Sequence, residues 1–212
     1  PEFIENDLLH IGEGSNLLFL NPFKGMVLHS RIKGIRHYVK DDDNVFVIAG
    51  AGEKWTDIVD WCISHGIAGL ENLAGIPGEV GASAVQNVGA YGAEAADFIH
   101  SVECFDIQTR KTLTLCAEQC RYGYRDSIFK HEYKGRMIVM RVSYRLRFGS
   151  QAANLSYQPL RKFAESLSHA PSIREVADEV VRLRNSKLPD PAVTGSAGSF
   201  FKNPVVSSYF FQ

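Results

Sequence analysis

The stretch from Gly75 to Gly92, GIPGEVGASAVQNVGAYG, constrains the fold more than any other segment, because it places five glycines in eighteen residues with almost no charge. Glycine loses more conformational freedom on folding than any other residue, so clustered glycines are useful where the backbone takes positive φ or closely contacts a ligand. A glycine-rich linker is the alternative, but linkers are rarely interrupted by apolar residues such as Ile76, Val80, Val85 and Val88. The segment therefore predicts a low, folded surface that cradles a flat anionic cofactor.

Composition and charge exclude several classes of protein. The chain has 212 residues, 45% of them hydrophobic, with 23 basic and 24 acidic residues and a formal net charge of −1. No overall electric field therefore attracts nucleic acid or a membrane surface. The four cysteines form no CxxC pair and are expected to be reduced thiols. No apolar run approaches the roughly 18 residues of a membrane span, and the sequence shows no signal peptide, so we expect a cytoplasmic protein.

Apolar periodicity predicts strands mixed with helices. The strands are expected at 26–32, 44–48, 99–106, 111–115 and 140–148, with a further strand from Asp7 and a strand or short helix ending at Leu20. Apolar spacing predicts helices at 55–65 and 173–187, the second beginning with a capping box formed by Ser172 and Glu175. Residues 149–171 are expected to be largely irregular. Because the elements show no regular β-α-β alternation, the pattern predicts an α+β fold.

Two shorter glycine motifs differ from the common nucleotide-binding signatures. The segment Gly12-Glu13-Gly14-Ser15-Asn16 follows a predicted strand, so its backbone N–H groups and its polar side chains can hold a phosphate. A dinucleotide fingerprint would require a third glycine where Leu17 stands, and Ala49-Gly50-Ala51-Gly52 likewise meets Trp55 where glycine is required. The sequence contains no GxxxxGK[ST] motif. These differences argue against Rossmann and P-loop nucleotide sites.

Three basic side chains have both a chemical and a structural explanation. Arg125 lies in YGYRDS, where it can hold an anion or pair with Asp126. Arg184 and Lys187 lie about one helical turn apart, where they can hold a diphosphate or stabilise the last turn through the helix dipole.

Two hydroxyl groups are similarly ambiguous. Tyr157 stands alone in a polar stretch, where it is either a packing anchor or a lid residue. Ser199 precedes two phenylalanines, and it can deliver a proton to a carbanion or cap a turn. It does not lie in a GxSxG motif, which argues against a serine hydrolase.

The motifs taken together resemble a known family. GEGSN, AGAGE, GLENLAGIPGEVGASAVQNVGAYG, YGYRDS, KLPDP and AGSFFKNP occur in one order, over essentially residues 7–206. In them the chain resembles the UDP-N-acetylenolpyruvoylglucosamine reductases, also called UDP-N-acetylmuramate dehydrogenases. The resemblance implies a two-part FAD-binding domain of the vanillyl-alcohol-oxidase (PCMH) type followed by the start of a substrate-binding domain. It assigns residues 1–33 to the remainder of the first FAD-binding subdomain, 34–188 to the second, including the Tyr157 segment, and 189–212 to the substrate-binding domain.

The resemblance also implies a reaction in bacterial cell-wall synthesis. In the family, NADPH reduces FAD, and the flavin passes a hydride to the enolpyruvyl group of UDP-N-acetylglucosamine enolpyruvate to give UDP-N-acetylmuramate. Arg125 matches the arginine that binds the substrate carboxylate, and Ser199 matches the proton donor. Four residues match groups that hold the UDP diphosphate and its neighbourhood: Tyr157, Arg184, Lys187 and Asn203. The residues that match FAD contacts are Gly12, Gly14, Ser15, Asn16, Leu17, Gly75, Ile76, Pro77, Gly78, Gly81, Ala82, Ser83, Gln86, Asn87, Gly89, Ala90, Tyr91 and Gly92.

The sequence also departs from the family pattern. Family members begin well upstream of Pro1 and continue after Asn203 into a long substrate domain that carries a catalytic glutamate. The resemblance therefore predicts impaired or absent turnover by these 212 residues alone. A non-enzymatic flavin- or nucleotide-binding fragment is the contrasting hypothesis. A third is an oxidase of the same flavin fold acting on phenols or sugars, against which KLPDP and AGSFFKNP argue.

Overall fold

The computed structural model describes residues 8–41, 44–151, 154–189, 193–195 and 201–207, and the structural statements below concern these residues. The strands are β1 (Leu8–Ile11), β2 (Met26–His29), β3 (Ile35–Asp41), β4 (Asn44–Gly50), β5 (Ile67–Ala68), β6 (Gly89–Ala90), β7 (Ala93–Glu94), β8 (Ile99–Asp106), β9 (Lys111–Cys116) and β10 (Met137–Phe148). The α-helices are α1 (Trp55–Ser64), α2 (Val80–Gln86), α3 (Gln158–Glu165) and α4 (Ile173–Asn185). The short 3-10 helices are η2 (Glu71–Leu73), η3 (Ala95–Asp97), η4 (Glu118–Cys120) and η5 (Ile128–Lys130). Helices and strands are mixed without regular alternation, which confirms the predicted α+β class.

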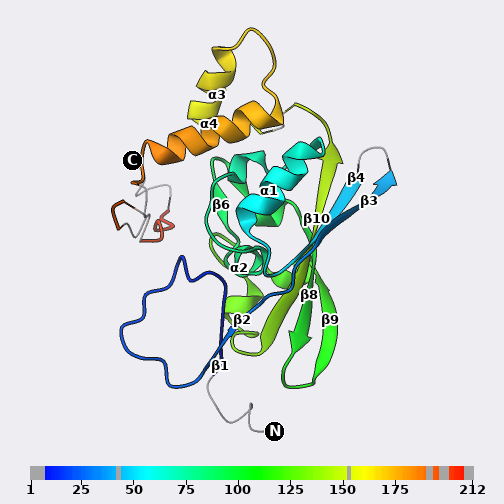
Figure 1. Cartoon of the computed structure of the whole chain (residues 1–212), viewed down its shortest axis with the longest axis vertical. Coiled ribbons are helices and arrows are strands. Elements are labelled where there is room, and N and C mark those ends of the chain that lie inside the picture. The colour runs from blue at the N-terminus through cyan, green and yellow to red at the C-terminus, as the bar shows by residue number, and fades with distance from the viewer. Residues whose placement is uncertain (1–7, 42–43, 152–153, 190–192, 196–200, 208–212) are drawn as a thin grey trace.

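A six-stranded antiparallel sheet forms the centre of the fold (Figure 1). Its order is β3-β4-β10-β8-β9, and β5 pairs with the far end of β10. Val142, Tyr144 and Leu146 are buried whereas Arg145 and Arg147 are exposed, as the alternation expected for residues 140–148 predicts. Phe148, expected on the core face, departs from this pattern and is 46% exposed. β10 thus presents one face to the core and the other to solvent.

Helix α1 packs against this sheet through its predicted apolar stripe, formed by Trp55, Ile58, Val59 and Cys62. The Trp55 ring meets the Tyr144 ring edge-on, with the centroids 6.0 Å apart, and its indole N–H donates to the carbonyl oxygen of Leu73 at 2.8 Å. Full burial of a large apolar side chain contributes roughly 1.5–3 kcal/mol. The core therefore anchors the chain on both sides of the glycine-rich segment.

Two smaller units flank the central sheet (Figure 1). β1 and β2 form a two-stranded parallel sheet, and a long loop joins them. At the other end of the molecule, α3 and α4 lie together above α1. No helix in the described ranges combines the length and apolar character that a bilayer crossing requires.

Four local predictions were wrong. The strand expected at 26–32 ends at His29. Residues 17–20 form no strand or helix, and Leu18 and Leu20 are 71% and 83% exposed, because these apolar side chains find no neighbouring strand in the described fold. Residues 158–165, expected to be irregular, form α3, which places Pro159 in its first turn and buries Leu160 completely. The helix predicted to reach Lys187 ends at Asn185.

Candidate cofactor and substrate site

The glycine-rich segment folds into a short helix followed by a tight hairpin. Helix α2 ends at Gln86 and is capped by Asn87, whose φ of 49° is left-handed. β6 and β7 then pair around a two-residue loop in which Tyr91 and Gly92 have φ of 50° and 83°. A type I′ hairpin turn requires positive φ at both of these positions. The glycines therefore supply backbone geometry as well as a low surface.

These glycines also allow two segments of the chain to pack closely against each other. The Gly81 N–H donates to the carbonyl oxygen of Ala51 at 2.9 Å, and a Cβ on Gly81 would lie 2.8 Å from the Ala51 side chain. The two glycine motifs AGAGE and GIPGEVG thus pack directly against each other. This contact explains the short side chains at both positions without any nucleotide.

The GEGSN loop lies against the glycine-rich segment, as the resemblance implied. The Asn16 amide donates to the Gln86 side-chain oxygen at 2.9 Å, across 70 residues of sequence. A Cβ on Gly78 would lie 3.4 Å from the Ser15 hydroxyl, and one on Gly14 would meet nothing within 4 Å. The two segments predicted to contact FAD are therefore neighbours, and the space beside Gly14 is open.

The other predicted FAD contacts differ in accessibility. Two of them use their side chains inside the protein, since Ser83 is buried and donates to Val80 O at 2.7 Å, and Asn87 is fully buried. Pro77 is exposed, and Leu17 is 49% exposed. The predicted residues that are buried are Ile76, Gly81, Ser83, Asn87 and Gly89, and those of intermediate exposure are Gly12, Gly14, Gly75, Gly78, Ala82, Gln86, Ala90 and Tyr91.

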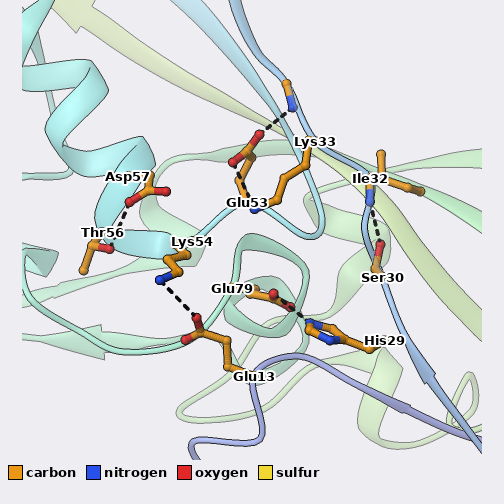
Figure 2. A network of polar contacts seen from close by, with 11 residues as sticks. Glu13, His29, Ser30, Ile32, Lys33, Glu53, Lys54, Thr56, Asp57 and Glu79 are labelled. Atoms are coloured by element: carbon orange, nitrogen blue, oxygen red, sulfur yellow. Dashed lines mark hydrogen bonds and ion pairs between the residues drawn. The ribbon is translucent and has the colours of Figure 1, made fainter.

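Sequence reasoning missed a hydrogen-bonded pair of side chains beside this loop, shown in Figure 2. The buried Glu79 carboxylate lies 2.8 Å from the His29 ring nitrogen, and a Cβ on Gly12 would lie 3.1 Å from the other Glu79 oxygen. Burial, and secondarily His29, lowers the pKa of His10 on the neighbouring strand. Nearby, Lys54 lies 3.9 Å from Glu13. No local motif signals the pair, because fifty residues separate its two members.

Arg125 projects toward the hairpin that follows α2. Its Nη1 donates to the carbonyl oxygen of Asn87 at 3.3 Å, and its Nη2 donates to the carbonyl oxygen of Gly89. Asp126, the structural partner considered from sequence, instead lies 2.8 Å from His131, whose hydrogen bond lowers the pKa of that carboxyl. Pairing with Asp126 is therefore not the role of the Arg125 side chain in this structure. A guanidinium has five N–H donors, so these two bonds leave donors for an anion.

Tyr157, Arg184 and Lys187 gather around Tyr91. The Tyr91 and Tyr157 rings meet edge-on with centroids 5.3 Å apart, and the Lys187 ammonium donates to the Tyr157 hydroxyl at 3.4 Å. Burial raises the pKa of the Tyr91 hydroxyl, and Arg184 and Lys187 oppose that shift. A Cβ on Gly75 would lie 3.4 Å from the Arg184 side chain. Two cations and two phenols thus form a group suited to hydrogen-bond and neutralise a phosphate.

The last predicted motif is only partly described. Ser199 lies outside the described residues, so its predicted role stays a prediction. Asn203 is exposed. Its neighbour Lys202 places its ammonium 5.4 Å from the centroid of the Tyr124 ring, and the Arg125 guanidinium lies 5.6 Å from the same centroid. The end of the described chain therefore returns to the loop that carries Arg125.

A family described as "FAD binding domain" matches residues 5–115 of the chain. Among curated relatives, UDP-N-acetylenolpyruvoylglucosamine reductase of Neisseria meningitidis serogroup A is 48% identical over 210 residues, and the enzyme of that name in Porphyromonas gingivalis is 47% identical over 202 residues. These matches cover 98% and 95% of this chain, respectively. The chain spans about 60% of the length of each relative.

A solved structure agrees with these sequence matches. The crystal structure of UDP-N-acetylenolpyruvylglucosamine reductase (MurB) from Thermus caldophilus matches with a TM-score of 0.65 at 27% identity, and the match covers 96% of this chain and 64% of that one. The predicted resemblance is therefore confirmed by sequence and by fold.

Proposed function

The chain belongs to the family of FAD-binding domains, and we propose that it binds FAD and serves the NADPH-dependent reduction of UDP-N-acetylglucosamine enolpyruvate to UDP-N-acetylmuramate in bacterial cell-wall synthesis. The observation that most supports the proposal is the convergence of the GEGSN loop, the glycine-rich segment and Arg125. The relatives named as this reductase support the choice of substrate.

The chain's own residues fit an elongated anionic cofactor. Gly14 and Gly78, with φ of 77° and 111°, place two backbone bends without side chains where the GEGSN loop meets the glycine-rich segment. In our proposal these segments hold FAD, which supplies hydride transfer when bound. Small residues such as Ala82 and Ala90 keep the adjacent surface low enough for a flat ring.

The polar groups around this surface would orient the substrate. Arg125 retains donors for the enolpyruvyl carboxylate and would stabilise the charge that develops during reduction. The cluster around Tyr157, with Arg184 and Lys187, would hold the diphosphate, and Asn203 would contribute nearby. Ser199 would deliver the proton to the substrate carbon. Binding at several points fixes the reacting carbon, which is how positioning lowers a barrier.

An absorption spectrum of the purified chain tests the first part of the proposal. We expect FAD bound during expression, or restored by titration, to give a flavin spectrum, and a chain that never takes up FAD would refute the cofactor assignment. Anaerobic addition of NADPH should bleach the flavin, and a return of its colour on adding the enolpyruvyl substrate would report hydride transfer to that substrate. Flavin binding without bleaching by NADPH would favour the non-enzymatic alternative.

The Arg125→Lys variant separates the effect of the positive charge from that of the planar guanidinium shape in binding the substrate carboxylate. The ammonium keeps the charge but loses the planar fork that binds a carboxylate through two hydrogen bonds. We expect weaker substrate binding with retained FAD. Lys134→Arg, at an exposed lysine in another loop, is the matched control and should change neither.

A further inference from the structure

We propose that Asn87 is a positioning residue that holds the Arg125 guanidinium in place through its buried amide and its own carbonyl oxygen. The inference rests on the proposed function, because the substrate role of Arg125 comes from it. The resemblance placed Asn87 among FAD contacts. The structure gives its side chain different partners, all within the protein.

The Asn87 amide is completely buried and joins three segments. Its Nδ2 donates to the Glu94 carboxylate at 2.7 Å and to the carbonyl oxygen of Gly123 at 2.8 Å. Its Oδ1 accepts from the Ala96 N–H at 2.9 Å. With 0% exposure, this side chain has both N–H donors and one acceptor satisfied internally. The β6–β7 hairpin and the 123–126 turn are therefore fixed relative to the end of α2.

Asn87 also contacts the Arg125 side chain, through its backbone carbonyl oxygen. Arg125 lies two residues after Gly123, within a turn closed by reciprocal backbone hydrogen bonds between Gly123 and Asp126 at 3.1 and 3.0 Å. Its guanidinium then returns to the Asn87 and Gly89 carbonyl oxygens. Asn87 thus bonds both the base of the turn and the tip of the arginine. Losing its amide would free the turn while leaving the arginine itself unchanged.

Backbone geometry makes this arrangement selective for asparagine. Asn87 and Arg125 have φ of 49° and 54°, a region that asparagine tolerates better than most residues. An aspartate would fit the same space, but its oxygens could not donate to Glu94 or to the Gly123 carbonyl. A Cβ on Gly89 would lie 3.0 Å from Arg125 Nη1 and 2.8 Å from the Glu94 side chain, so the guanidinium approaches that glycine closely.

Two variants isolate the amide, and a third is their control. Asn87→Gly keeps the left-handed backbone and removes the side chain, whereas Asn87→Asp keeps the shape and removes the donor. The matched control is Arg110→Gly, because Arg110 is also left-handed, with φ of 57°, but lies in the turn between β8 and β9. Thermal unfolding first establishes which of the variants remain folded.

The first readout needs no ligand. NMR relaxation of the Arg125 side-chain Nε–H should give a high order parameter in the parent chain and a value below about 0.6 in Asn87→Gly, which marks a flexible group. Arg110→Gly should match the parent. Equal order in the parent and both Asn87 variants would overturn the proposal.

The second readout uses the FAD-loaded protein and two ligands that differ by the enolpyruvyl group, which carries the carboxylate. Flavin absorbance changes report binding of UDP-N-acetylglucosamine enolpyruvate and of UDP-N-acetylglucosamine. We expect Asn87→Gly to weaken binding of the first about tenfold, which corresponds to about 1.4 kcal/mol, and to leave the second and FAD unchanged. Equal weakening of both ligands, or loss of FAD, would overturn the positioning role.

The two readouts separate this inference from the proposed function. Suppose that the parent chain binds FAD but neither ligand, that its Arg125 side chain is ordered, and that Asn87→Gly makes this side chain flexible. The positioning role of Asn87 then stands, and the substrate assignment fails. If the parent discriminates the two ligands and Asn87→Gly discriminates them equally well, the substrate assignment stands and the positioning inference fails.

Discussion

Gly50→Ala should destabilise the protein strongly because two backbone segments meet at this position. The Gly50 N–H donates to the Gly34 carbonyl oxygen and the Gly52 N–H donates to the Ile32 carbonyl oxygen, both at 3.0 Å. A Cβ on Gly50 would overlap the Ile32 carbonyl oxygen and lie 2.7 Å from its carbonyl carbon. Both are backbone atoms and cannot rotate away. The segment after β2 would therefore have to separate from β4.

The expected loss follows from those contacts. Two hydrogen bonds contribute about 1 kcal/mol each, and overpacking costs about 1–3 kcal/mol. We therefore expect the free energy of unfolding to fall by about 3–5 kcal/mol, a large part of the roughly 5–15 kcal/mol typical of a domain. FAD affinity should also fall, because this contact supports Ala51, against which Gly81 packs.

Urea denaturation followed by the fluorescence of Trp55 and Trp61 measures the effect. Gly149→Ala is the matched control, since its Cβ would meet only the Ala68 side chain, at 4.0 Å, and its φ is ordinary. We expect the control to stay within about 0.5 kcal/mol of the parent. A Gly50→Ala midpoint indistinguishable from that of Gly149→Ala would refute the close-approach argument.

Two further outcomes are expected. Burial raises the pKa values of Cys62 and Cys104 to about 12 and of Cys120 to about 11, whereas Cys116 is exposed. Maleimide should therefore label one thiol in the folded chain and four after unfolding. Rapid labelling of a second thiol in the folded chain would contradict this prediction. Hydrogen bonds from Ser172, then from His169, lower the pKa of Glu175 from 4.5 to about 2, so its stabilisation is present above pH 4.5 and is lost as the pH falls toward 2. Glu175→Gln should remove that part of the acid dependence of unfolding, and an unchanged profile would show that the carboxylate contributes nothing.

Elements with a strong repeating pattern were predictable from sequence. β10 alternates buried and exposed residues, and α1 and α4 have clear apolar stripes, so local patterning and burial agree. β3 gave no such signal because it is an edge strand with six exposed residues among seven. α2 was not predicted, because the small residues that allow its close packing against Ala51 show little of the apolar periodicity of a helix.

The sequence motifs of the candidate site could be predicted, but the contacts between its residues could not. The glycine-rich segment and the GEGSN loop are recognisable because both need unusual backbone geometry, and the fold brings them together. No local sequence pattern predicts the contact between His29 and Glu79, since contacts between distant segments depend on the whole fold. The direction of Arg125 likewise depends on two carbonyl oxygens that no side-chain pattern encodes. The assigned contacts to FAD and substrate stay predictions.

The central position of β10 has a consequence for synthesis on the ribosome. The region matched as an FAD-binding domain ends at residue 115, but β10 begins at Met137 and pairs with β4, β8 and β5. The hairpins β3–β4 and β8–β9 emerge earlier and lack the strand that lies between them in the finished sheet. Isolated hairpins are at best marginally stable. Cofactor capture should therefore wait until residue 148 has left the exit tunnel, and nascent chains that stop before β10 should remain sensitive to protease.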